Sequence, residues 1–121
     1  AVAQAIAEAV VAIDRTLILV GLSGSRLIEA GQAAGLTVLN EAFADRRYRA
    51  ADALVSRETS GAVIREPAAA AAQATALAHG LGVRSPEGVP LAVRADTICL
   101  HSDTPDAINI ARAVHAALNP G

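Results

Sequence analysis

Cysteine, aromatic side chains and charge of one sign are all scarce in this 121-residue sequence, and each scarcity excludes a class of protein. Cys99 is the only cysteine, so no internal disulfide can form, and a reducing compartment is expected. One Phe, one Tyr and no Trp leave little aromatic surface for stacking on bases, and a net charge of −2 provides no basic face. We therefore expect no nucleic acid among the partners of this chain.

Long hydrophobic runs are also missing. No apolar stretch approaches the roughly 18 residues needed to span a membrane. Residues 1–13 lack the basic leader and the cleavage pattern of a signal peptide. A chain of 121 residues is long enough to bury one hydrophobic core. The sequence thus predicts a single domain over residues 1–121 with no membrane among its partners.

What the sequence does contain is a regular alternation of helix and strand patterns. The expected elements are helices over 1–13, 25–34, 67–79 and 105–118, strands over 16–20, 36–40 and 96–100, a short strand over 53–55, and a hairpin that pairs 83–85 with 91–93. Residues 46–66 otherwise show no clear periodicity and are expected to form a long polar loop. Strands that alternate with helices favour an α/β fold, in which right-handed βα units build a parallel sheet.

Polar side chains gather where two of these strands end. Residues 97–100 have the composition of a buried strand, and His101 and Asp103 follow it. Asp103 or Thr104 can cap the next helix, and Pro105 suits its first turn. The carboxyl end of a strand beside a helix start is where α/β proteins bind ligands, anions in particular. An ordinary capped turn is the alternative interpretation.

The second polar cluster, residues 41–49, follows the strand at 36–40. It holds two carboxylates, three arginines and a tyrosine. Because parallel strands end at the same edge of a sheet, five residues are expected to converge on one side: Glu41, Asp45, Arg46, His101 and Asp103. The turn at 21–25 could also cradle a phosphate or a carboxylate, although a tight turn alone would need the same small residues.

Three motifs, in this order, resemble the LamB/YcsF family over the whole chain. They are Glu41-Ala42-Phe43-Ala44-Asp45-Arg46-Arg47-Tyr48, then Leu54-Val55-Ser56-Arg57 with Gly61-Ala62-Val63-Ile64, then Asp96-Thr97-Ile98-Cys99-Leu100-His101-Ser102-Asp103-Thr104-Pro105. The family patterns are roughly E-x-F-A-D-R-x-Y, D-G-x-L-V-x-R and T-I-C-x-H-G-D-T-P. The chain departs from them at Ser102, where the family usually has Gly, and at Ala53, where Asp-Gly is usual.

The resemblance implies the carboxyl-terminal half of a distorted (β/α) barrel of the glycoside hydrolase and deacetylase type, with the family's amino-terminal half absent. It also implies a component of a cytoplasmic, ATP-dependent 5-oxoprolinase, which hydrolyses 5-oxoproline to glutamate together with B and C subunits. ATP is the nucleotide that the full complex would use. A half barrel exposes two sheet edges, so the chain alone is expected to self-associate and to be inactive.

Opening a lactam requires recognition of the substrate carboxylate and a placed water or nucleophile. The expected catalytic residues are His101, Asp103, Glu41 and Asp45, and the expected substrate-binding residues are Arg46, Arg57 and Tyr48. Cys99, inside its strand, is expected to pack and not to react. Three alternatives stay open: Asp45 and Arg46 form a structural ion pair, His101 and Asp103 bind a metal in a deacetylase-like hydrolase, or the chain is an inactive interaction module.

Overall fold

The computed structural model describes all 121 residues and contains four helices and seven strands. In chain order these are α1 (Val2–Ile13), β1 (Ile18–Leu22), α2 (Arg26–Ala33), β2 (Thr37–Phe43), β3 (Tyr48–Ala50), β4 (Ala53–Leu54), α3 (Pro67–Ala78), β5 (Val83–Arg84), β6 (Pro90–Leu91), β7 (Thr97–Cys99) and α4 (Ala107–Leu118). The longest helices have 12 residues, and no helix is long and apolar enough to cross a membrane.

The central sheet has three parallel strands in the order β1-β2-β7. The first part of β2 pairs with β1, beginning with Thr37 opposite Ile18, and its last part pairs with β7, ending with Phe43 opposite Cys99. Two antiparallel pairs, β3 with β4 and β5 with β6, lie outside this sheet. The α/β class and the parallel sheet expected from the sequence are therefore confirmed.

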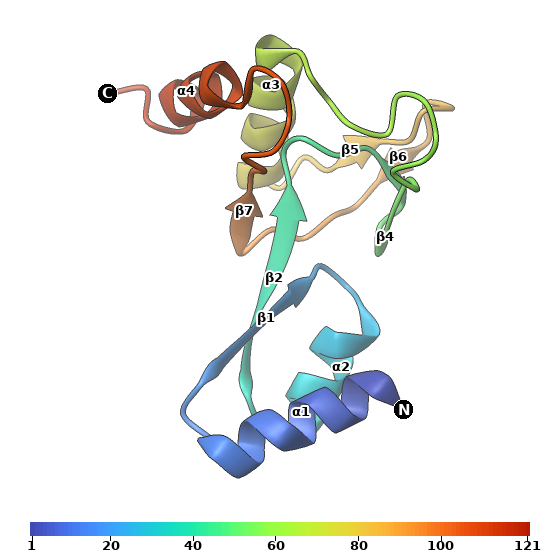
Figure 1. Cartoon of the computed structure of the whole chain (residues 1–121), viewed down its shortest axis with the longest axis vertical. Coiled ribbons are helices and arrows are strands. Elements are labelled where there is room, and N and C mark those ends of the chain that lie inside the picture. The colour runs from blue at the N-terminus through green and yellow to red at the C-terminus, as the bar shows by residue number, and fades with distance from the viewer.

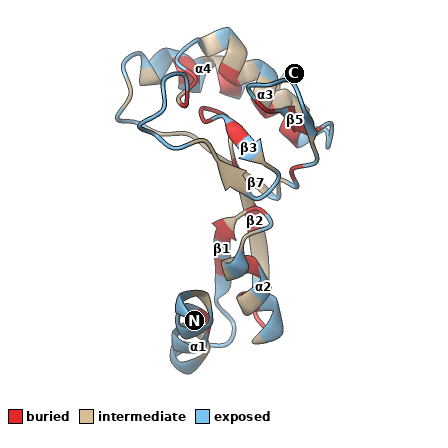
Figure 2. Cartoon of the chain, turned by 90° about the vertical axis from the view of Figure 1, so that its right-hand side faces the viewer, coloured by how far each residue is buried: buried red, intermediate tan, exposed pale blue.

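Strand β2 connects two lobes of the molecule (Figure 1). The first lobe contains α1, α2 and β1, and α2 packs against both β1 and β2. The second lobe contains α3, α4, β7 and the two antiparallel pairs, and α3 packs along α4. The side view shows the narrow connection between the lobes and the buried residues on α3 and α4 (Figure 2). The polar cluster that follows β2 and the one that follows β7 both belong to the second lobe.

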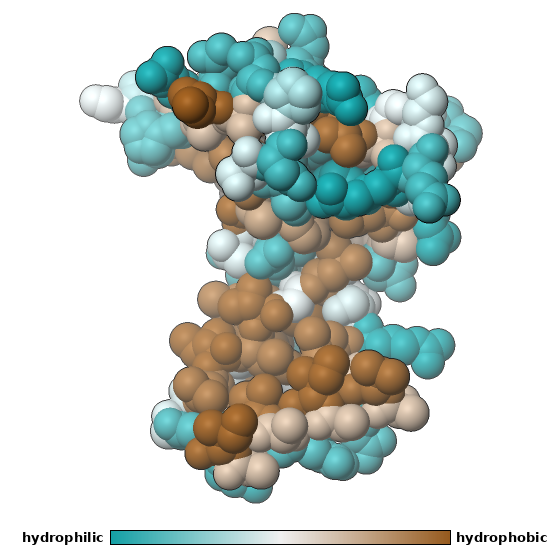
Figure 3. Space-filling model, in the orientation of Figure 1, coloured by the Kyte–Doolittle hydropathy of each residue, from teal (hydrophilic) through white to brown (hydrophobic).

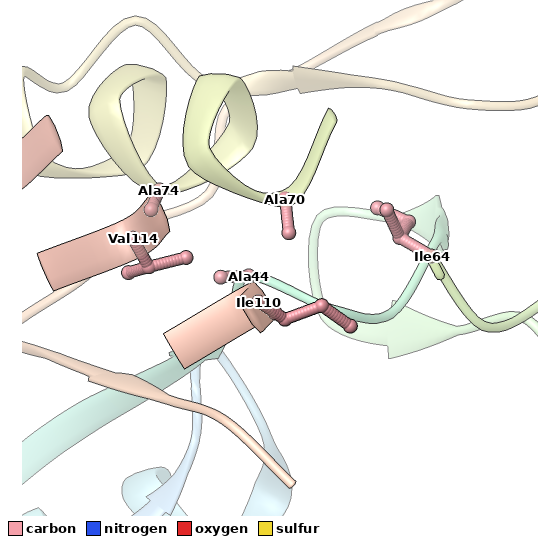
Figure 4. Packing of buried hydrophobic residues seen from close by; sticks show 6 residues of the cluster. All are labelled: Ala44, Ile64, Ala70, Ala74, Ile110 and Val114. Carbon is pink, nitrogen blue, oxygen red and sulfur yellow. The ribbon is translucent and has the colours of Figure 1, made fainter. Parts of the chain in front are cut away.

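The core of the second lobe lies between the sheet and the helices α3 and α4. Its main cluster is Ala44, Ile64, Ala70, Ala74, Ile110 and Val114, and a second cluster is Ala42, Tyr48, Leu77, Val83 and Val93. In Figure 4 the alanine side chains of α3 point toward Ile110 and Val114 of α4. Because alanine fills little volume, the alanine-rich sequence of α3 allows the two helices to pack closely.

The helices cover one face of the sheet. Side chains alternate between the faces of a strand. Leu19 and Val38 lie against Gly31 of α2, and Ala42 and Ala44 are buried in the two clusters of the second lobe. The strand residues that alternate with these point to the opposite side of the sheet, which we call the open face. They are Ile18, Val20, Leu39, Glu41, Phe43 and Cys99.

The open face changes character along the strands. At its first-lobe end it is apolar, and Ile18 and Val20 are 55% and 42% exposed. Figure 3 shows a hydrophobic surface on the lower lobe, to which α1 also contributes, in contrast to the mostly hydrophilic upper lobe. At its second-lobe end Glu41, Phe43 and Cys99 are half-buried. The carboxyl ends of β2 and β7 thus carry the polar side chains of this face.

Two strands differ from the sequence predictions in their bounds. β1 covers Ile18–Leu22 instead of 16–20, and β2 continues to Phe43 instead of ending at Asn40. The extension of β2 follows from its second partner, because Glu41, Ala42 and Phe43 pair with β7. The loop predicted for 46–66 also contains the strand β3, whose three residues show no hydrophobic alternation.

The start of the last helix also differs. α4 begins at Ala107, so Pro105 precedes the helix instead of lying in its first turn. The N-cap residue is Asp106, which has a φ of 66° and makes no side-chain capping bond. Neither Asp103 nor Thr104 caps the helix, because the chain makes a further turn before Ala107. In this turn the Ala107 N–H donates a hydrogen bond to the Thr104 carbonyl.

Replacing Gly31 with alanine is expected to destabilise the first lobe. An alanine Cβ at this position would lie 2.7 Å from Leu19 Cδ2 and 2.8 Å from Val38 Cγ1. The cost of overpacking exceeds the gain in helix propensity, so the free energy of unfolding should fall by about 1–2 kcal/mol. Urea denaturation would measure it, with Gln32→Ala on the exposed side of α2 as the control. A Gly31→Ala chain as stable as the original would contradict this close packing.

Candidate active site

Asp45 and His101 meet at the carboxyl end of the sheet. Asp45 follows β2 and His101 follows β7, each two residues beyond the last pair, Phe43 opposite Cys99. The His101 backbone N–H donates a hydrogen bond of 2.8 Å to Asp45 Oδ2. The ring Nδ1 of His101 lies 3.0 Å from Oδ1 and 3.1 Å from Oδ2 of the same carboxylate. The structure thus places these two predicted site residues in direct contact.

The carboxylate of Asp45 determines which nitrogen of the His101 ring carries the proton. The Asp45 side chain is 1% exposed, and its carboxylate contacts the His101 ring. An ionised carboxylate only accepts hydrogen bonds, so Nδ1 is the donor and the neutral ring has its lone pair on Nε2. Nε2 has no partner within the chain, and the His101 side chain is 25% exposed. This nitrogen is therefore available to accept a proton or to bind a ligand.

The orientation of the His101 ring is fixed from a second side. The ring stacks on Phe43 of the open face, with centroids 5.3 Å apart and planes inclined by 20°. Asp45 is itself held in place, because its backbone carbonyl accepts a hydrogen bond of 2.8 Å from the Ile64 N–H. A pair oriented in this way needs little reorganisation before it takes part in a proton transfer.

Glu41 supplies a second carboxylate on the open face, beside Cys99. Burial raises the pKa of the Cys99 thiol, and the negative charges of Glu41 and Asp45 and a hydrogen bond with Glu41 raise this pKa further. The thiol therefore stays protonated at neutral pH and is a poor nucleophile, in line with the expectation that Cys99 packs. Glu41 is half-buried and close enough to Asp45 for both carboxylates to act on the same thiol.

Known proteins are similar to this chain over nearly its whole length. The profile of the LamB/YcsF family matches residues 1–120. The chain belongs to the LamB/YcsF family. It is 48% identical over 116 residues to the 5-oxoprolinase A subunit of Rhodopseudomonas palustris (strain BisB18), and 45% identical over 117 residues to that of Geobacillus thermodenitrificans (strain NG80-2). These matches cover 96% and 97% of this chain and 46% of each relative.

A solved structure is also similar. The crystal structure of the lactam utilization protein from Thermus thermophilus matches 98% of this chain with a TM-score of 0.87 and 42% identity. The match covers 47% of that protein. The chain therefore has the fold of this LamB/YcsF structure and spans about half the length of the relatives that it matches.

Arg46 occupies a buried position in this family member. It is 8% exposed, and its Nη2 donates a hydrogen bond of 2.8 Å to the Val55 carbonyl, while Nε is buried without a partner. Burial, and then the nearby charge of Arg57, lower the pKa of Arg46. The alternative of an ion pair between Asp45 and Arg46 is wrong, because the Asp45 carboxylate is taken by His101 and the guanidinium turns toward the loop.

Tyr48 is fully buried in the core of the second lobe. Its hydroxyl oxygen accepts a hydrogen bond of 2.9 Å from the Phe43 N–H, at the point where β2 ends. Burial is the main reason why the pKa of Tyr48 is raised. In this position Tyr48 supports the turn that carries Asp45.

The other two predicted site residues lie on exposed segments. Arg57 is in the loop that follows β4, where it lines a surface cavity. Asp103 is in the loop between β7 and α4, two residues beyond His101, and it makes no hydrogen bond or ion pair within the chain. The structure thus joins Asp45 and His101, places Glu41 on the open face beside Cys99, and leaves Arg57 and Asp103 on exposed loops.

Gln73 is a positioning residue that sequence analysis does not identify. From the middle of α3, its Nε2 donates hydrogen bonds of 2.8 Å to the carbonyls of both Phe43 and Arg46. It therefore bridges the two ends of the turn that contains Asp45. A long amide side chain among the alanines of a packed helix is the signal that could have revealed this role.

Asn40 and Asp96 form a second missed contact. The Asn40 backbone N–H and Nδ2 donate to Asp96 Oδ2 at 2.8 and 3.1 Å, and Asn40 Oδ1 accepts a bond of 3.0 Å from the Gly24 N–H. The bonds from Asn40 are the main cause of the lowered pKa of Asp96. This contact fixes the loop after β1 and the start of β7 against β2.

No group of three or more His, Cys, Asp and Glu side chains in this chain is arranged to hold a metal ion. His101 and Asp103 do not combine with a third such residue. The residues of this chain therefore do not by themselves form the ligand set of a metal site.

Proposed function

We propose that this chain supplies the proton-transfer residues of a 5-oxoprolinase A subunit, in which His101 acts as general base and acid and Asp45 orients it. The observation that carries the proposal is the buried contact of Asp45 with His101 Nδ1, which leaves Nε2 free beside the open face. The names of the relatives support the reaction: they are 5-oxoprolinase A subunits and a lactam utilization protein.

The chemistry of ring opening suits this pair. As water adds to the carbonyl carbon of the lactam, His101 Nε2 accepts a proton from that water, and Asp45 stabilises the imidazolium that forms. When the ring C–N bond breaks, the same nitrogen returns the proton to the departing amine. Glu41 would orient the water, a role supported by the position of its carboxylate on the open face beside Cys99. In the complete complex, bound ATP would supply the free energy of ring opening, and its terminal phosphoryl group would leave as inorganic phosphate.

We further propose that the site is completed by residues outside this chain. The chain spans about half of its relatives, and the open face ends in exposed Ile18 and Val20. The remaining half of the polypeptide would cover this face and close a barrel around the Asp45–His101 pair. The relatives are named as subunits, which supports partner proteins as well, and we take these partners to be B and C subunits.

The proposal is tested by the ATP-dependent formation of glutamate from 5-oxoproline. We expect turnover from the complete complex that contains this chain and none from the 121-residue chain alone, since the open face would be exposed to water. Glutamate release and ADP release are both measured, so that ATP hydrolysis that is not coupled to ring opening is detected. Turnover by the chain alone would show that the other half is not needed, and a complete complex without turnover would refute the proposed reaction.

A further inference from the structure

Three arginines surround a surface cavity beside the candidate active site. The cavity has a volume of about 680 Å³ and is formed chiefly by the loop between β4 and α3. Arg47, Arg57 and Arg65 line it together with Thr59 and Ser60. In Figure 3 hydrophilic side chains gather on the upper right, where the green loop before α3 lies in Figure 1.

The three guanidinium groups have no partner within the chain. None of them forms an ion pair or a side-chain hydrogen bond, whereas the guanidiniums of Arg46, Arg84 and Arg94 all do. Glu58 and Glu66 also line the cavity but pair with none of the three arginines. All three arginines are exposed, and the residues lining the cavity carry a net positive charge. The cavity therefore presents unneutralised cations to an incoming ligand.

The backbone that carries these arginines is held in place. The Arg47 N–H donates to the Ala62 carbonyl at 2.9 Å, and Arg46 forms a β-bridge with Val63. The Ala62 N–H in turn donates to the Thr59 carbonyl at 3.2 Å. The loop thus runs antiparallel to the segment after Asp45 and is not a freely moving connection. Because the backbone is already ordered, an anion bound by these arginines would have to order only their side chains.

The same frame connects the cavity to the active site. Ile64, which lines the cavity, donates its N–H to the Asp45 carbonyl at 2.8 Å. Ala69, in the first turn of α3, also lines the cavity, so the positive end of this 12-residue helix adds to the field of the arginines. A ligand in the cavity would lie next to the segment that positions the Asp45–His101 pair.

We propose that this cavity binds the phosphate chain of a nucleoside polyphosphate. A single carboxylate is satisfied by one arginine in a bidentate pair, whereas three unpaired arginines with two hydroxyls match several phosphate oxygens. The volume of about 680 Å³ also exceeds what one carboxylate needs. The proposal rests on the proposed function, which requires ATP, and it assigns the nucleotide to a place on this chain.

The test measures the binding of inorganic tripolyphosphate to the complete complex by calorimetry, apart from any turnover. Arg57→Gln and Arg65→Gln are each expected to weaken binding about 10-fold, and Arg57→Lys less, because it keeps the charge and loses the fork of donors. Arg15→Gln is the matched control, since Arg15 is an exposed, unpaired arginine of the first lobe. The affinity of the control should equal that of the original protein.

The outcomes separate this site from the proposed function. Weaker tripolyphosphate binding by the cavity variants, with an unchanged control, supports the site whether or not the complex opens 5-oxoproline. Unchanged binding in both cavity variants overturns the proposal, even if the Asp45–His101 pair proves essential for turnover. A second titration, with 5-oxoproline, tests whether the cavity instead binds the carboxylate of the substrate. If the variants weaken only that titration, the cavity binds the substrate carboxylate and the polyphosphate proposal is wrong.

Discussion

Replacing His101 with alanine is expected to lower the kcat of ring opening in the complete complex by about 100-fold or more, which is the contribution typical of a general acid or base. The KM for 5-oxoproline should change little, because the imidazole transfers a proton in the transition state and does not bind the substrate in the ground state. The measurement is steady-state glutamate formation with saturating ATP.

The control for this experiment is His115→Ala. His115 is exposed in the last turn of α4, away from the sheet, and its removal should leave turnover unchanged. Circular dichroism of both variants checks that the second lobe is folded. Full turnover by a folded His101→Ala complex would reduce the contact with Asp45 to a structural support of the turn after β7.

Replacing Asp45 with asparagine is expected to reduce kcat by a similar factor of about 100 or more, although the side chain keeps its shape. In the native site two N–H donors, the backbone and Nδ1 of His101, approach one carboxylate. An amide offers only one acceptor oxygen, and its NH₂ group opposes the second donor. The ring then favours the proton on Nε2, so the nitrogen that should accept a proton already carries one.

Two comparisons make the Asp45→Asn experiment specific. Asp52→Asn removes the same charge from an exposed position between β3 and β4 and should leave kcat unchanged. The double variant of Asp45 and His101 should be no slower than His101→Ala alone, because the aspartate acts through the histidine. If the fold-decreases in kcat of the two single variants multiply in the double variant, Asp45 has a role that does not depend on His101.

The position of Asp45 and His101 at one edge of the sheet could be predicted because it depends on topology. Alternating strands and helices indicate parallel strands, and the ends of such strands lie at one edge of the sheet. The register then places Asp45 and His101 at equal distances beyond the last pair. No side-chain detail was needed for this step, which is why the sequence pattern was sufficient.

The direction of the neighbouring side chains could not be predicted in this way. Arg46 and Tyr48 belong to the same polar cluster as Asp45, yet both are buried and bond to backbone groups. Their direction depends on the turn after β2, whose course is set by Gln73 on a helix that lies far along the chain. Likewise, Asn40 shows its role only when Gly24 and Asp96 are beside it. Such long-range bonds have no local signature in a sequence.

The position of β2 in both lobes has a consequence for how the chain unfolds. The groups that hold the Asp45–His101 pair, at Phe43, Ile64 and His101, all follow Asn40 in the sequence. The first lobe contributes α1, α2 and β1, whose outer residues are exposed, and such segments open at a low free-energy cost. The first lobe can therefore detach and refold as a separate cooperative unit while the second lobe keeps its structure. The contact between Asp45 and His101 would persist while the first lobe is unfolded.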